Sequence, residues 1–177
     1  NKFYGFGICQ KINLKIRDKE RAIAPTTSQY LQVMIGTESG YTYFSPKLYI
    51  TETHRDELTN ELSITAYDAI YKMSANVVDD IGLTSNMTLL MYAGEAAGYY
   101  GLLVSVKGDN TPFLTNYEEI ANFEGTEPVR ELMDAVAEAT QSIYYCDADD
   151  NIIFRQLDKD GEAAYTIDKE QYFTMDS

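Results

Sequence analysis

The first 70 residues alternate between apolar and polar side chains with the period of β-strands. In segment 8–17, Ile12, Leu14 and Ile16 alternate with polar or charged residues, which predicts a half-buried strand. Further strand-like stretches lie at residues 30–35, 41–53 and 59–66. Pro46 predicts that the longest of these lies at a sheet edge or is bulged, because proline cannot donate to a strand ladder. Four successive strands without a long helix favour a small antiparallel barrel or sandwich.

The pattern changes at residue 68, where helical spacing begins. A short helix is predicted over 68–73, and residues 86–99 are helix-like, with Ser85 as a plausible N-cap. A strand is predicted at 102–106, followed by a loop over 107–118. A boundary near residues 73–84 therefore separates a β-rich first half from a second half that contains helices.

The clearest helix is predicted over residues 127–140. Its apolar positions recur with the spacing of one helix face, at Val129, Leu132, Met133, Val136 and Thr140. Thr126 is a suitable N-cap, Pro128 suits the first turn, and Glu127 suits the positive end of the helix dipole. This segment therefore predicts an amphipathic helix packed on a sheet.

The C-terminal part reads as strands joined by turns. Strands are predicted at 142–146, 152–157 and 163–167, and Asp160-Gly161 is a hairpin signal. We therefore predict an α+β, β-rich fold with two domains. Residues 1–73 form a partial antiparallel β-barrel, incomplete at its N-terminus, and residues 74–177 form a small α/β domain with a helix on an antiparallel sheet.

Charge and composition exclude several classes of protein. The chain has 28 acidic and 14 basic side chains and a net charge of −14, and its basic residues do not cluster, so a nucleic-acid partner is not expected. With 45% apolar residues the chain folds, yet no apolar run approaches the roughly 20 residues of a membrane span. Cys9 and Cys146 are too few for a disulfide framework.

The acidic turn from Asp147 to Asn151 invites comparison with a calcium loop. Asp147, Asp149 and Asn151 occupy the first, third and fifth positions of such a loop. Position six, however, is Ile152 instead of glycine, which removes the sharp turn and starts a strand. A solvated hairpin turn is the better interpretation.

Other candidate chemistry is equally sparse. Glu52, His54 and Asp56 alternate along one predicted strand, but with one histidine in the chain and no CxxC pair a zinc or iron site is not expected. A Ser or Cys nucleophile would have only His54 as a base, and no GxSxG, GxGxxG or P-loop motif is present. We therefore predict no catalytic, cofactor-binding or metal-binding residues, no cofactor and no enzyme activity.

Two stretches together resemble a known family. One is residues 49–74, which contains Thr53-His54-Arg55-Asp56 and Ala66-Tyr67-Asp68 at the ends of two strands. The other is residues 121–161, where a helix precedes a strand, an Asp-rich turn and a strand. This arrangement resembles the tail hub or baseplate hub proteins of bacteriophages and prophages, also called tail-associated or late control proteins.

The resemblance implies a structural role in the virion. Members of that family form a homotrimeric ring at the tip of the tail tube and carry two similar barrels, so three chains imitate a six-fold ring. It implies that residues 1–73 are much of the first barrel, that a second barrel follows Ser177, and that the chain, which starts at Asn1 without Met, is a piece of a longer one. Tail tube and spike or tip proteins are the implied partners, with assembly in the bacterial cytoplasm.

An alternative function uses the tyrosines. The chain has 15 Tyr and no Trp, and five tyrosines gather in the first half, at positions 41, 43, 49, 67 and 71. Tyrosine is favoured at protein interfaces, although it also serves as a bulky strand residue. Tyrosine-rich loops would equally suit a carbohydrate-binding or cell-surface-binding module of a tail or surface protein. An acid-pair glycosidase is a third possibility, but no carboxylate pair is marked out.

Overall fold

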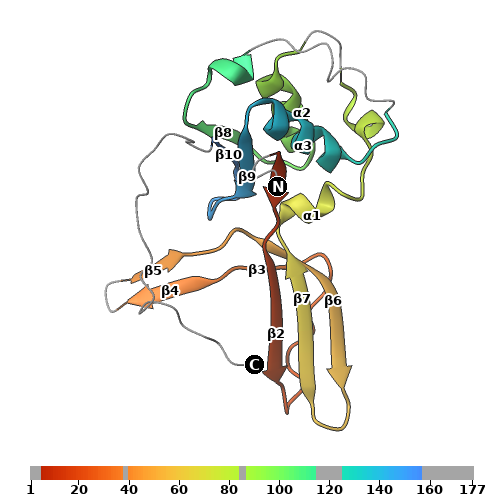
Figure 1. Cartoon of the computed structure of the whole chain (residues 1–177). Helices are drawn as coiled ribbons and strands as arrows, with labels where there is room; N and C mark the ends of the chain where they lie inside the picture. The colour runs from red at the N-terminus through yellow and green to blue at the C-terminus, as the bar shows by residue number, and fades with distance from the viewer. Residues whose placement is uncertain (1–4, 38–39, 84–86, 115–124, 157–177) are drawn as a thin grey trace, which may run out of the picture.

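The computed structural model describes residues 5–37, 40–83, 87–114 and 125–156. These residues form two four-stranded sheets, one above the other in Figure 1, and a separate two-stranded hairpin. Helices lie only in the upper half of that view, beside the mixed sheet. The predicted α+β class is confirmed.

The lower sheet, called the antiparallel sheet below, is a curled half-barrel. Its strand order is β2 (Lys11–Arg17), β7 (Glu61–Tyr67), β6 (Leu48–Asp56) and β3 (Tyr30–Leu31). In its register Leu14 lies opposite Ile64, and β6 is bulged between Ile50 and Glu52. The inward side chains form a core of their own, made of Leu48, Ile50, Leu62, Ile64 and Ala66.

Two predicted strands are each divided in the structure. The stretch 30–35 becomes β3 and β4 (Met34–Thr37), and the stretch 41–53 becomes β5 (Gly40–Tyr43) and β6. Strands β4 and β5 pair only with each other in the described residues. Pro46 lies in the gap between β5 and β6, so its missing N–H ends a strand instead of bulging one.

The upper sheet, called the mixed sheet below, has the order β1 (Phe6–Ile8), β9 (Ser142–Cys146), β10 (Ile152–Gln156) and β8 (Val104–Lys107). The β9–β10 pair is antiparallel, as the hairpin pattern predicts. The edge strands differ from the expected antiparallel arrangement, because β1 runs parallel to β9 and β8 runs parallel to β10. Each parallel pair joins segments that are distant in the chain, which parallel pairing requires.

The helices α1 (Ala69–Lys72), α2 (Leu89–Tyr99) and α3 (Val129–Ala139) are accompanied by two short 3-10 helices, η1 (Val78–Ile81) and η2 (Thr111–Leu114). Helix α3 packs against α2, β1 and β9. The apolar face predicted for it is confirmed, since its four apolar members are fully buried and the fifth, Thr140, is 2% exposed.

The helix starts differ from the sequence prediction. Pro128, not Thr126, is the N-cap residue of α3, and no side chain caps that end. Thr88 caps α2 by accepting a hydrogen bond from the Met91 amide, while the predicted cap Ser85 lies outside the described residues. None of the described helices is long and apolar enough to cross a membrane.

The division into 1–73 and 74–177 stays a prediction, and one strand crosses it. Strand β1 comes from the first part of the chain but pairs with β9 in the mixed sheet, through Phe6–Ile143, Gly7–Tyr144 and Ile8–Tyr145. The chain therefore passes from the mixed sheet into the antiparallel sheet between β1 and β2. The predicted strand 163–167 and the Asp160-Gly161 turn lie outside the described residues.

Candidate functional site

A buried polar junction connects the two sheets. Asp68, at the N-cap of α1, accepts hydrogen bonds from the Gln10 amide at 2.8 Å, the Ile70 amide at 3.1 Å and the Cys9 thiol at 3.3 Å. The Gln10 side chain in turn donates to the Cys146 carbonyl at 3.0 Å. Burial raises the pKa of the Asp68 carboxyl above its ordinary value, although these hydrogen bonds oppose the shift.

The acidic turn contributes the second part of this junction. Asp150 accepts hydrogen bonds from the Lys47 amide at 3.1 Å and the Tyr49 hydroxyl at 3.2 Å, and the Lys47 ammonium lies 3.4 Å away. Asp150 is only 8% exposed. The turn is therefore a solvated hairpin at Asp149, as predicted, but its last acid is buried against β6.

The calcium-like positions of the acidic turn hydrogen-bond within the chain. One carboxylate oxygen of Asp147 accepts from the amides of Asp149 at 3.0 Å and Asn151 at 2.9 Å, which is the bonding of a closed turn. Asp150 faces Lys47, as described above. Among the residues that the structure describes, no group of three metal-ligating side chains comes together.

Glu52, His54 and Asp56, which alternate along β6, have different local surroundings. Asp56 accepts hydrogen bonds from the amides of Leu58 and Thr59, at 2.8 and 3.2 Å, and so closes the β6–β7 turn. These two bonds hold the pKa of its carboxyl below the ordinary value. His54 and Glu52 are exposed on the strand. One carboxylate oxygen of Asp56 therefore bonds within the turn.

The two cysteines are free thiols. Burial, followed by the nearby charge of Asp68, raises the pKa of the Cys9 thiol to about 12. Burial also raises the pKa of the Cys146 thiol. Both are therefore protonated at neutral pH, whereas a reactive cysteine is a thiolate.

A cavity of about 430 Å³ lies beside this junction and is called the tyrosine cavity. It is lined by the side chains of four tyrosines, at positions 49, 71, 99 and 100, together with Lys72 and Asn76. The Lys72 ammonium lies 3.0 Å from the Tyr49 ring centroid, and burial lowers the pKa of that ammonium. The Tyr100 hydroxyl donates to the Asn76 side chain at 3.1 Å.

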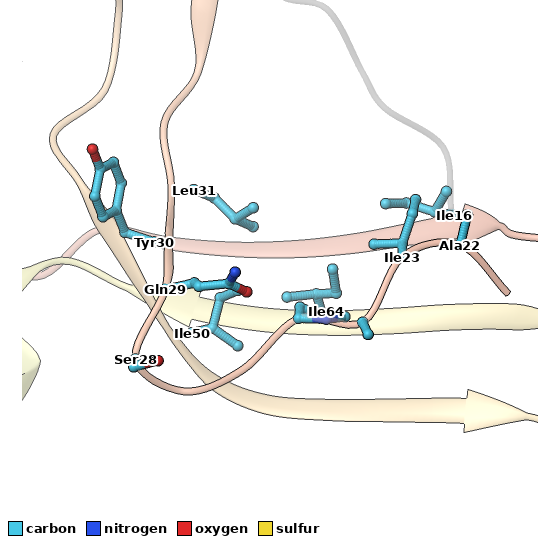
Figure 2. A pocket seen from close by; sticks show the side chains of 11 residues that line it. Ile16, Ala22, Ile23, Ser28, Gln29, Tyr30, Leu31, Ile50 and Ile64 are labelled. Carbon is cyan, nitrogen blue, oxygen red and sulfur yellow. The ribbon is translucent and has the colours of Figure 1, made fainter.

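A second cavity, of about 640 Å³, opens on the antiparallel sheet and is called the apolar cavity. Figure 2 shows side chains from strands β2, β3, β6 and β7 together with side chains from segment 22–29. Asp18 fixes that segment by accepting from the amides of Ala22 at 3.0 Å and Ile23 at 3.1 Å. Arg55 donates to Asp18 at 2.9 Å and to the Ile23 carbonyl at 2.7 Å.

Strands β4 and β5, with Phe44, form what is called the aromatic hairpin (residues 34–37 and 40–44). It extends to one side of β2, away from β7 and β6 (Figure 1). Its described large side chains are strongly exposed, at 52% for Met34, 80% for Tyr41, 54% for Tyr43 and 71% for Phe44. Contiguous exposed apolar side chains are typical of interaction surfaces.

Sequence reasoning located few of these features. The position of Asp68 immediately before α1 is an N-cap signal that could have identified it. The partners of Asp150 are 101 and 103 residues away in the chain, and Arg55 and Asp18 are 37 residues apart. Neither contact can therefore be predicted from a local sequence pattern. Of the five tyrosines that the sequence groups together, only Tyr49 and Tyr71 line the tyrosine cavity, and the fold adds Tyr99 and Tyr100 to them.

Comparison with known proteins gives matches at the level of structure. No protein family description and no curated protein matches the sequence. The 43 kDa tail protein of prophage MuSo2 from Shewanella oneidensis is similar over 82% of this chain and 43% of its own, with a TM-score of 0.54 and 15% identity. Prophage tail protein gp18 from Listeria monocytogenes EGD-e is similar over 82% and 40%, with a TM-score of 0.53 and 13% identity.

These two likenesses extend across both sheets, since they cover most of the chain. The chain spans less than half the length of either protein. At such low identity the likeness concerns the backbone and not particular side chains. The arrangement of a curled half-barrel beside a helix-covered sheet is thus the fold of part of these prophage tail proteins.

Proposed function

We propose that this protein is a non-enzymatic structural component of a phage or prophage tail, located in the hub at the tip of the tail tube. The observation that carries the proposal is the shared fold with two prophage tail proteins over 82% of the chain. The resemblance of residues 49–74 and 121–161 to tail hub proteins supports the same role from the sequence.

The buried junction is consistent with a permanent structural part. Asp68 and Asp150 join the sheets through hydrogen bonds to Gln10, Lys47 and Tyr49. Satisfied buried polar networks specify one arrangement of the elements they join. In the proposed role, residues 1–73 and 74–177 act as two domains of a homotrimeric hub that connects the tail tube to a spike or tip protein.

The test uses the natural full-length protein in phage particles. Particles induced from the host are labelled with an antibody to this protein and examined by electron microscopy, and the purified protein is weighed by native mass spectrometry. We expect label at the tail end distal to the capsid and a trimeric mass. Label on capsids, or particles free of the protein, would contradict the tail role, and a strictly monomeric full-length protein would contradict the hub.

The tyrosine cavity favours a second candidate function, the binding of a saccharide. Tyr71 and Tyr99 are 44% and 48% exposed, and Asn76 adds polar groups. Saturation-transfer NMR with soluble cell-wall saccharide fragments tests this. We expect transfer to sugar protons that is lost in Tyr99→Ala and retained in Tyr43→Ala, a matched tyrosine change outside the cavity. Equal transfer in both variants, or none in the unchanged protein, would reject it.

A further inference from the structure

The tyrosine cavity contains a cation that has no ion-pair partner among the described residues. The Lys72 ammonium lines this cavity and lies 3.0 Å from the centroid of the Tyr49 ring. None of the ion pairs formed within the described part of the chain includes Lys72. Burial lowers the pKa of this ammonium, because the charge has lost part of its water. An anion that entered the cavity would therefore compensate a charge that the ring contact compensates only weakly.

The carboxylates near this ammonium already accept hydrogen bonds from protein donors. Asp68 lines the cavity, is 0% exposed and accepts the three hydrogen bonds described above. Asp150 attracts the Lys72 ammonium without forming an ion pair with it, and its oxygens accept from Lys47 and Tyr49. The acidic groups around the cavity are thus bonded within the protein.

The polar groups that the cavity offers to a ligand are mainly donors. The side-chain oxygen of Asn76 accepts from the Tyr100 hydroxyl at 3.1 Å, so the nitrogen of the same amide supplies donors only. The Lys72 ammonium also has donors and no acceptor. Hydroxyl groups in the lining can donate or accept, so they suit either kind of ligand. Two donor groups match the two oxygens of a carboxylate, whereas a phosphate brings three oxygens and more charge.

Two exposed tyrosine rings give the cavity an apolar wall. The Tyr71 ring stacks on Tyr67, with ring centroids 4.4 Å apart and an angle of 14° between the planes. Tyr99 meets Tyr100 edge to face, with centroids 5.1 Å apart. These contacts hold the rings of Tyr71 and Tyr99, which are 44% and 48% exposed. The carbon–hydrogen face of a pyranose is apolar, so it can pack on such rings.

We propose that the tyrosine cavity binds an acidic sugar, a pyranose that carries a carboxylate. The carboxylate bonds to the Lys72 ammonium and the Asn76 amide nitrogen, and the apolar face of the ring packs on Tyr71 and Tyr99. The cavity volume of about 430 Å³ is within the range of small-molecule pockets, about 300–1,000 Å³. The inference rests on the second candidate function, saccharide binding, and deepens it by naming the class of saccharide.

The experiment compares ligands that differ in the charged group. Methyl glucuronoside carries a carboxylate where methyl glucoside carries a hydroxymethyl group, and acetate is a carboxylate without a ring. Affinities for the full-length protein are measured by saturation-transfer NMR at about 0.15 M salt, where the negative charge of the chain is screened beyond about 8 Å. Lys72→Gln removes the cation, and Lys107→Gln is the matched control, because Lys107 is exposed on β8 and does not line the cavity. Circular dichroism verifies that each variant is folded.

We expect methyl glucuronoside to bind about tenfold more tightly than methyl glucoside, because hydrogen bonds to charged groups are stronger than those between neutral groups. The difference should disappear in Lys72→Gln and remain in Lys107→Gln. Equal affinities of the unchanged protein for the two sugars would overturn this inference and keep the saccharide candidate, whereas binding of neither sugar would reject both.

Two further results would overturn the inference alone. One is acetate that binds as tightly as methyl glucuronoside, since the ring would then contribute nothing. The other is a preference for the acidic sugar that survives in Lys72→Gln. The comparison of ligands on the unchanged protein does not depend on the folding of any variant, and the labelling of particles tests the tail role independently of all these results.

Discussion

The Tyr49 hydroxyl donates a hydrogen bond to the Asp150 carboxylate at 3.2 Å, across 101 residues of the chain. Tyr49 belongs to the antiparallel sheet and Asp150 to the β9–β10 turn of the mixed sheet, so this contact is one of those that join the two sheets. Lys47 strengthens it, because its amide and its ammonium both face the same carboxylate.

Changing Asp150 to Asn should therefore destabilise the protein. Asn tolerates the left-handed backbone at this position, where φ is 68°, so the change tests the charge and not the backbone. Hydrogen bonds to a charged group are worth about 2 kcal/mol, and we expect a loss of about that size in the free energy of unfolding, measured by urea denaturation. The exposed neighbour Asp149→Asn should change it by less than about 0.5 kcal/mol. Equal effects of the two changes would refute the role of Asp150.

The same substitution at two glycines should have opposite effects. A Cβ at Gly7 would come within 2.6 Å of the Tyr144 ring, which packs on β1, so Gly7→Ala should lower the free energy of unfolding by about 2 kcal/mol. A Cβ at Gly98 in α2 meets nothing within 4 Å, so Gly98→Ala should raise it by about 1 kcal/mol through helix propensity.

Thermal and urea unfolding of both variants check this pair. If Gly7→Ala proved as stable as the unchanged protein, the close packing of β1 on Tyr144 would be wrong. If Gly98→Ala were less stable than the unchanged protein, the finding that an added Cβ at Gly98 meets no neighbouring atom would be contradicted.

Stability should decline in alkaline solution partly because of Tyr49. Burial, followed by the negative charge of Asp150, raises the pKa of Tyr49 to about 12, against about 10 in an unfolded chain. The unfolded chain then loses the proton first, so stability is lost as the pH rises from about 10 to about 12. Urea unfolding across this range should show a shallower decline in Tyr49→Phe. Some of the decline should remain in Tyr49→Phe, because burial also raises the pKa of Tyr100 to about 12. If the loss of stability with pH were the same in Tyr49→Phe as in the unchanged protein, the raised pKa of Tyr49 would be contradicted.

The two thiols should react slowly in the folded protein. Burial raises the pKa of Cys9 to about 12 and also raises that of Cys146, so little thiolate exists at about pH 8. With an aromatic disulfide reagent we expect almost no colour from native protein and two equivalents after unfolding in guanidinium, since both cysteines are free. Rapid release of one equivalent from native protein would show that Cys9 is accessible.

The acidic turn should not bind calcium. The Asp147 carboxylate already accepts hydrogen bonds within the turn, and Asp150 is paired with Lys47. Calorimetric titration with calcium should therefore give only heats of dilution, and Asp147→Asn should not change them. A saturable heat that disappears in Asp147→Asn would reverse this assignment.

Much of the secondary structure follows from local pattern. Alternation identifies β2 and β7, and 3.6-residue spacing identifies α3 with its buried face. The failures are at positions where tertiary contacts override local preference. Strand β1 is three residues long, follows Gly5 and has Gly7 at its centre, and it becomes a strand because β9 supplies its partners. The predicted cap Thr126 is bypassed, because the amide of Val129 donates instead to the Asn76 carbonyl at 2.9 Å.

By itself, the sequence determined the elements and the charge of this protein, because periodicity, turn residues and side-chain ionisation are local properties of the chain. It also determined that no motif for catalysis or metal binding is present in the usual spacing. Only the tertiary structure decided that Asp150 meets Tyr49, that four tyrosines share one cavity, and that an aromatic hairpin and an apolar cavity are exposed among the described residues. Such contacts join residues tens to more than a hundred positions apart, and the free energy that selects them comes from burial of the whole fold and not from any local pattern.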